Sequence, residues 1–117
     1  MVYFLRLSQP LGNRWHTARW YVGYTFDDRT LQQRILAHTS GTAAAFTRAA
    51  VLRGIKIEFM GVIDGGRETE RAIKFRKNHA REYERLNKRG LIQPKSWLRT
   101  YANTRFEGEP IAGSLCQ

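Results

Sequence analysis

Hydrophobic and polar residues follow one another in three short runs that predict β-strands. Residues 2–7 form an apolar run compatible with a buried strand, and residues 20–25 combine aromatic and β-branched side chains. Residues 55–59 alternate between apolar and polar, and an apolar run continues to residue 63. This is the clearest strand pattern in the chain. The segment 8–19 has a loop composition, so the first two strands are expected to form a hairpin with a long connection.

Three other segments have the three- and four-residue apolar spacing of amphipathic helices. The first is expected at 28–39, directly after Asp27, a residue type that favours helix N-termini. The second is expected at 43–52, and the third, a long helix, at 67–88. A glycine follows closely after each of the last two segments, as is common where helices end.

The predicted order is therefore β-β-α-α-β-α with a C-terminal tail. This order is typical of a small α/β (α+β) fold, with a three-stranded antiparallel or mixed sheet flanked by helices. At 117 residues and 42% hydrophobic content, the chain is long enough to bury one real core. We assign residues 1–90 to this domain and residues 91–117 to a C-terminal extension of unknown role that is not a separate domain.

The charge balance changes this picture by indicating a partner. The chain has 20 Lys and Arg against 10 Asp and Glu, a formal charge of +10, which is expected of a protein that meets polyanions. No apolar run approaches the ~20 residues of a membrane span, so no membrane partner is expected. The N-terminus lacks the pattern of a signal peptide, and the single cysteine, Cys116, excludes a disulfide framework. We expect a cytoplasmic, nucleoid-associated protein.

Candidate chemistry lies where the second strand leads into the first helix. Tyr21 leaves the strand, and Arg34 and His38 share one stripe of the helix beside it, which makes a plausible phosphate site. In phosphodiester hydrolysis, Tyr21 or Tyr3 could take the proton of the attacking water, provided that positive charge lies nearby. The guanidinium of Arg34 supplies that charge and a phosphate clamp, and His38 would orient the water or relay a proton.

Five short segments, in this order, resemble the GIY-YIG endonuclease family, and most closely its small, structure-specific subgroup. They are Val2-Tyr3-Phe4, Tyr21-Val22-Gly23, the R-x-x-x-H pair Arg34 and His38, the run Gly41…Ala45-Phe46-Thr47-Arg48, and the E-x-x-I-K segment Glu70-Arg71-Ala72-Ile73-Lys74. The resemblance covers residues 2–80. The chain departs from the family pattern in having Val2 in place of the first glycine, a longer gap between the two tyrosine motifs, and Asn78 at an unexpected spacing.

The resemblance implies that residues 1–90 are a catalytic domain, a metal-dependent DNA endonuclease with a single-metal mechanism. It implies that Glu70 binds one Mg²⁺ or Mn²⁺, and no second carboxylate is evident in the sequence. The implied catalytic set is Tyr3, Tyr21, Arg34, His38 and Glu70, and the implied contacts to the DNA backbone are Arg48, Arg71, Lys74 and Lys77. The expected partner is DNA, with branched or flapped DNA among the options. The expected role is in repair or in a mobile element, and a recruiting protein is a further possible partner.

Each of these residues also has a plain structural interpretation. Tyr3 and Tyr21 fit a core, Arg34 and His38 fit a solvated helix face, and Glu70 is favoured near a helix start by the macrodipole alone. Two other functions therefore stay open. One is a nuclease fold that binds nucleic acid without cutting it, and the other is a structural RNA-binding protein of ribosomal type. The tryptophans at 15 and 20 fit either base stacking or the core.

Overall fold

The sheet has three antiparallel strands, with β1 between the other two. The computed structural model describes residues 1–12 and 18–95, and there the sheet contains β1 (Val2–Leu7), β2 (Trp20–Tyr24) and β3 (Ile57–Ile63) in the order β2-β1-β3. β1 pairs antiparallel with both neighbours, so the predicted hairpin is confirmed and the sheet is antiparallel, not mixed. β1 is central because its side chains are apolar on both faces.

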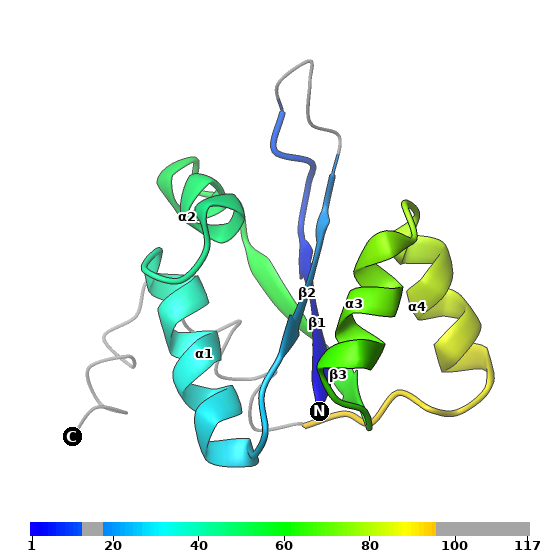
Figure 1. The fold of residues 1–117 in the computed structure, drawn as a ribbon. Coiled ribbons are helices and arrows are strands. Elements are labelled where there is room, and N and C mark those ends of the chain that lie inside the picture. Colours follow the sequence, from blue (N-terminus) through cyan, green and yellow to red (C-terminus); the bar gives the residue numbers. More distant parts are fainter. Residues whose placement is uncertain (13–17, 96–117) are drawn as a thin grey trace.

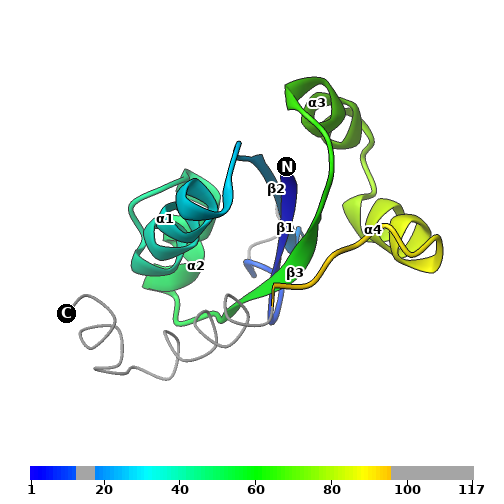
Figure 2. The ribbon, with the colours of Figure 1, turned by 90° about the horizontal axis from the view of Figure 1, so that it is seen from below.

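Helices cover both faces of this sheet. α1 (Asp28–Ser40) and α2 (Ala45–Leu52) lie on one face, and α3 (Arg67–Phe75) and α4 (His79–Lys88) lie on the other (Figures 1 and 2). The fold is α+β, and within the described residues the order is β-β-α-α-β-α-α. None of these helices is long and apolar enough to cross a membrane.

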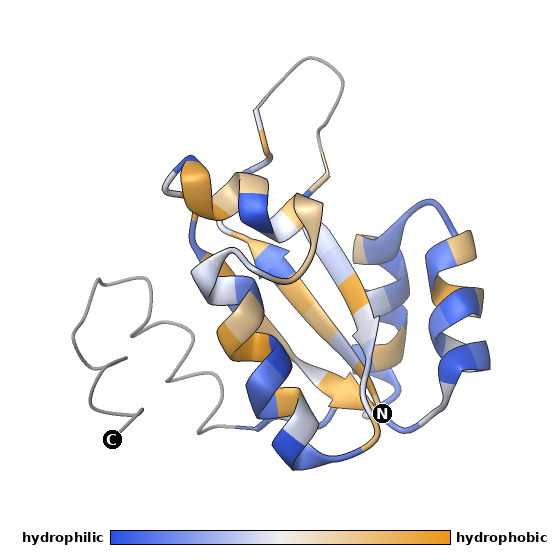
Figure 3. Cartoon of the chain, turned by 60° about the vertical axis from the view of Figure 1, so that its left-hand side comes forward, coloured by the Kyte–Doolittle hydropathy of each residue, from blue (hydrophilic) through white to orange (hydrophobic). Residues whose placement is uncertain are grey.

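The alternation of side chains along β1 creates two hydrophobic cores. Tyr3 and Leu5 point to the core under α1 and α2, whereas Val2 and Phe4 point to the core under α3 and α4. Hydrophobic residues are accordingly concentrated in the strands of the sheet (Figure 3). The buried ring of Tyr3 thus faces α1, and this orientation decides where a site can form.

The predicted first helix is confirmed in position and in its buried stripe. Asp27 caps α1 by accepting a hydrogen bond from the backbone N–H of Thr30, and the Thr30 hydroxyl in turn accepts one from the N–H of Asp27. Leu31 and Ile35 are fully buried against the sheet. Gly41 ends the helix with a φ of 81°, a left-handed conformation that favours glycine.

The prediction of one long helix at 67–88 is wrong, because the chain breaks it into α3 and α4. Arg76 has an extended backbone, and Asn78 begins α4 by accepting a hydrogen bond from the N–H of Arg81 at 3.0 Å. The apolar spacing continues across the break because Ile73 of α3 and Leu86 of α4 pack into the same core. Periodicity alone therefore could not show that the helix ends. Asn78 is a helix cap, in line with its exclusion from the candidate catalytic set.

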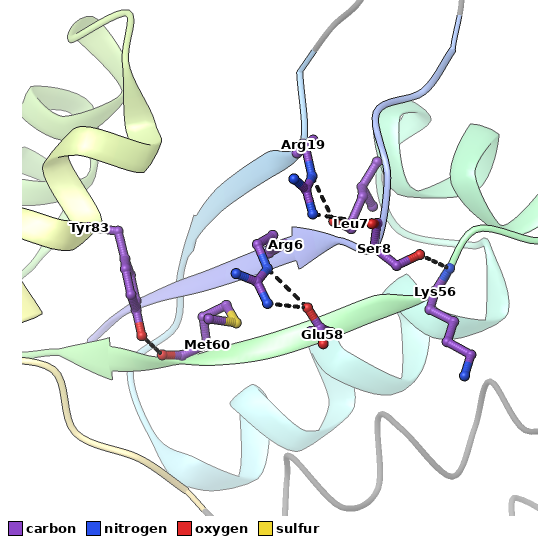
Figure 4. Close-up of polar contacts among 8 residues, drawn as sticks. All are labelled: Arg6, Leu7, Ser8, Arg19, Lys56, Glu58, Met60 and Tyr83. Carbon is purple, nitrogen blue, oxygen red and sulfur yellow. Dashed lines mark hydrogen bonds and ion pairs between the residues drawn. The ribbon is translucent and has the colours of Figure 1, made fainter.

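Polar contacts fix the sheet at the start of the 8–19 loop and at a bulge in β3 (Figure 4). The guanidinium of Arg19 donates to the carbonyls of Leu7 and Ser8, at 3.2 and 3.1 Å. Opposite β1, the register skips Met60, and the Met60 carbonyl instead accepts a hydrogen bond from the Tyr83 hydroxyl of α4 at 2.8 Å. The bulge therefore provides the acceptor that ties α4 to the sheet.

The first residues of the predicted extension pack onto the domain. Gln93 exchanges two backbone hydrogen bonds with Val62 of β3, at 2.8 and 2.9 Å, and Ile92 packs against the second core. Lys95 forms an ion pair with Asp28 of α1 at 3.2 Å. Trp15 and residues 96–117 of the predicted extension lie outside the described residues.

The break between α3 and α4 gives a testable prediction. Replacing Asn78 by Ala removes the cap of α4, and we expect the free energy of unfolding to fall by about 1 kcal/mol. Asn87→Ala, at an exposed position in the last turn of the same helix, should cost nothing, because alanine is the better helix former. Urea denaturation of both variants measures the difference, and equal stabilities would contradict the capping role.

Candidate functional site

Tyr3 lies at the centre of the candidate site. Its side chain is 1% exposed, and its hydroxyl lies 2.8 Å from Nε2 of His38 on α1. Gly23 is its partner on β2, and a Cβ built on Gly23 would lie 2.3 Å from the Tyr3 ring. The glycine of the Tyr21-Val22-Gly23 segment is therefore required sterically, because only a residue without a side chain lets the ring pass over β2.

Tyr21 lies on the same face of β2, two residues before Gly23. Its ring centroid is 6.2 Å from that of Tyr3 and 4.6 Å from that of His38. On its other side, it stacks with Phe46 of α2, with centroids 6.4 Å apart and planes inclined by 18°. Unlike Tyr3, Tyr21 is only half-buried. Of the two tyrosines, Tyr21 is thus the one that solvent and a substrate can reach.

His38 continues the hydrogen-bonded chain to Thr47 of α2. Its Nδ1 lies 2.8 Å from the Thr47 hydroxyl, and that hydroxyl donates to the carbonyl of Ala44 at 3.2 Å. A hydroxyl has one hydrogen, so the Thr47 oxygen is left to accept from Nδ1–H. We therefore assign the tautomer in which Nε2 carries the lone pair and accepts a hydrogen bond from Tyr3.

Burial keeps both partners of this hydrogen bond uncharged. Burial, assisted by the charge of Arg34, lowers the pKa of His38 to about 4. Burial also raises the pKa of Tyr3 well above its usual value; the charges of Tyr21 and Glu70 act in the same direction and that of Arg34 opposes them. At neutral pH, a protonated tyrosine thus faces a neutral imidazole.

Arg34 and Glu70 approach Tyr3 from different elements. Arg34 lies one helical turn before His38 on α1, is exposed, and forms no ion pair within the described part of the chain. Glu70 is 9% exposed and lies on α3, which packs beside the edge strand β2. The charge of Arg34 lowers the pKa of the Tyr3 hydroxyl and that of Glu70 raises it.

Lys74 joins α3 to this cluster. Its ammonium lies 3.0 Å from the Glu70 carboxylate, one turn away on the helix, and 5.5 Å from the centroid of the Tyr21 ring. The side chain therefore reaches around the edge of the sheet to the face that carries the tyrosines. Lys74 was predicted only to contact a DNA backbone, and the structure places it within the cluster.

Glu70 is the acidic residue that contacts the cluster around Tyr3, through Lys74. Among the residues that the structure describes, no group of three or more His, Cys, Asp or Glu side chains could hold a metal ion. Asp27 caps α1 and Asp28 pairs with Lys95. A single buried carboxylate such as Glu70 fits a hard ion that takes its other ligands from a phosphate and water. The Lys74 ammonium would have to leave the carboxylate for that to occur.

The remaining predicted contacts are exposed but spread out. Arg48 lies on α2, and Arg71 lies on α3. Lys77 lies between α3 and α4 and lines a separate groove of about 420 Å³ together with Trp20 and His79. That groove contains none of the five predicted catalytic residues, so Lys77 is not part of the cluster around Tyr3.

The structure brings the five predicted residues together in unequal ways. Tyr3, Tyr21 and His38 are in direct contact, Glu70 is joined to the Tyr21 ring through Lys74, and Arg34 lies one helical turn before His38. Sequence reasoning missed Thr47 as a partner of His38, although it lies within the Phe46-Thr47-Arg48 run. No protein-family model, curated protein or solved structure matches the chain.

The neutral state of buried His38 predicts how stability depends on pH. Because its folded pKa, about 4, lies below the 6.5 of the unfolded chain, the unfolded state takes up the proton first as the pH falls. As the pH falls from about 7 to about 5, the titration of His38 should therefore lower the free energy of unfolding by about 2 kcal/mol. Urea denaturation of the wild type and His38→Gln at both pH values measures this, and an equal loss in both would contradict it.

Proposed function

We propose that this protein is a metal-dependent endonuclease that hydrolyses a DNA phosphodiester bond, as its resemblance to the GIY-YIG family implies. One observation supports this more than any other. The half-buried Tyr21 ring lies against His38 and Tyr3, with Lys74 and its partner Glu70 beside it at the sheet edge and Arg34 one helical turn before His38. Aromatic hydroxyls, a cation and a carboxylate in one place are what hydrolysis of a phosphodiester requires.

The two tyrosines would have different roles in this reaction. Tyr21 is accessible, so its hydroxyl would accept a hydrogen bond from the attacking water and direct it at the phosphorus. Tyr3 is buried and would act behind it, held in place by His38. The water oxygen would bond to phosphorus while the water proton passes to the Tyr21 oxygen and the Tyr21 proton passes to solvent. The bond to the 3′-oxygen breaks, and that oxygen takes up a proton from water. The negative charge that develops on the phosphate and on the leaving oxygen must therefore be stabilised.

Arg34 and Glu70 would handle that charge. The exposed guanidinium of Arg34 would bind a phosphate oxygen through its planar fork. Glu70 would hold Mg²⁺ or Mn²⁺, an ion whose chemistry is to stabilise charge that develops on oxygen. With Glu70 holding an ion, Lys74 would be free to contact the DNA backbone, as it was predicted to do.

A binding protein without nuclease activity is the second candidate. It is favoured by the ion pair between Glu70 and Lys74, which satisfies the carboxylate without any metal. It would bind nucleic acid through the excess of basic side chains alone. The two candidates differ in whether a metal ion changes what happens to bound DNA.

Glu70→Gln tests the enzyme against the binding protein. The amide keeps the shape but loses the charge that holds a metal, so Mg²⁺-dependent nicking of plasmid or branched DNA should fall at least about 100-fold. DNA affinity should be retained or increased, because a negative charge is removed. Glu68→Gln, on the exposed first turn of the same helix, is the matched control and should cut normally. Binding by the wild type with no nicks at any metal concentration would exclude the enzyme.

Thr47 gives an independent test as a positioning residue. Thr47→Val keeps the shape but leaves Nδ1–H of His38 without an acceptor, and we expect cleavage to fall on the order of tenfold. Thr47→Ser restores the hydroxyl and should recover both the rate and its pH profile. Thr42→Val, at an exposed threonine, serves as the control. A serine variant as slow as the valine variant would show that Thr47 acts through packing and not through its hydroxyl.

A further inference from the structure

A small pocket opens beside the candidate site, where β2, α1 and α3 meet. It has a volume of about 120 Å³, and its lining residues are Tyr24, Thr25, Phe26, Thr30, Arg34 and Arg67. Tyr24 ends β2, Thr25 and Phe26 follow it, Thr30 and Arg34 lie on α1, and Arg67 is the first residue of α3. Arg34 lines this pocket and lies one helical turn before His38, so the pocket adjoins the candidate site.

Two arginines give the pocket its charge. Within the described part of the chain, neither Arg34 nor Arg67 forms an ion pair with a carboxylate, although other arginines do, such as Arg6 with Glu58. Arg67 instead lies over the ring of Tyr24, 5.4 Å from its centroid. Two unpaired guanidinium groups from two helices thus line one cavity, an arrangement suited to a phosphate group.

The rest of the lining adds an aromatic ring and a hydroxyl. Phe26 is 72% exposed, although burial would be favourable for a side chain of this kind. Thr25 is 3% exposed, and its hydroxyl has no hydrogen-bond partner among the described residues. An exposed ring beside two cations is what single-stranded nucleic acid uses, because a base stacks on the ring while its phosphate meets the charge.

We propose that this pocket binds the nucleotide next to the scissile phosphate, with its phosphate between Arg34 and Arg67 and its unpaired base on Phe26. This inference rests on the proposed function, since it takes the neighbouring cluster as the place of cleavage. Arg34 can contact both phosphates because a guanidinium carries five N–H donors. The pocket thereby selects substrates in which at least one base beside the cut is free to leave the duplex.

Binding to DNA without metal tests the pocket separately from catalysis. Fluorescence anisotropy of the full chain with two oligonucleotides, a blunt duplex and the same duplex with a single-stranded overhang, is measured over a salt series. Phe26→Ala should bind the overhang about tenfold more weakly and the blunt duplex unchanged. Arg67→Gln should lower the salt slope for the overhang by about 0.7 to 0.9, the contribution of one phosphate.

The chain offers a matched control for each variant. For Phe26→Ala the control is Phe75→Ala, which removes another exposed ring (88% exposed) at the opposite end of α3 from Arg67. For Arg67→Gln the control is Arg89→Gln, which removes an exposed arginine after α4. Affinities of Phe26→Ala and Arg67→Gln that equal those of their controls would overturn the proposal, as would an equal loss with the blunt duplex.

Cleavage by the wild type with Mg²⁺ is scored separately. If Phe26→Ala and Arg67→Gln bind and cleave DNA normally, the proposal of a nucleotide pocket is wrong and the proposal of a nuclease stands. If both variants lose the preference for the overhang but the wild type does not cleave, the pocket is a nucleotide-binding site and the proposal of a nuclease is wrong. The two hypotheses therefore fail in different ways.

Discussion

The buried hydrogen bond between Tyr3 and His38 is the interaction on which the rest of the site depends. It joins the central strand to α1, and its geometry requires an uncharged imidazole, an acceptor for the second ring nitrogen, and space above Gly23. The imidazole belongs to α1, its second acceptor is Thr47 of α2, and the space is left by Gly23 of β2. Because an unpaired polar group in such surroundings is costly, the bond fixes how α1 lies on the sheet, and therefore where Arg34 emerges.

An edge of the sheet is the second determinant, since it lets residues from both faces meet. Tyr21 faces α1, whereas Glu70 and Lys74 belong to a helix on the opposite face. They come together because, within residues 1–12 and 18–95, β2 has no further strand beside it and α3 packs against that side. A fourth strand beyond β2 would separate the carboxylate from the tyrosines. The position of β2 in the sheet is thus as important for the site as the identity of the side chains.

Much of this was predictable from the sequence, and the failures have physical reasons. The three strands, α1 and α2 were predictable because their apolar patterns reflect burial against a single layer. The break before α4 was not, because it depends on one side-chain cap at Asn78 within a continuous apolar pattern. Thr47 was missed for a similar reason: its partner His38 lies on another helix, and local sequence patterns do not show contacts of that kind.

The short segment after α4 protects the opposite edge of the sheet. β3 would otherwise present a row of free backbone groups, and such edges recruit strands from neighbouring molecules. The two hydrogen bonds between Gln93 and Val62 occupy part of that row, and Gly61 leaves room for Ile92 to lie across it. A chain cut after Gly90 would thus retain every helix and strand of the domain and yet be prone to aggregation.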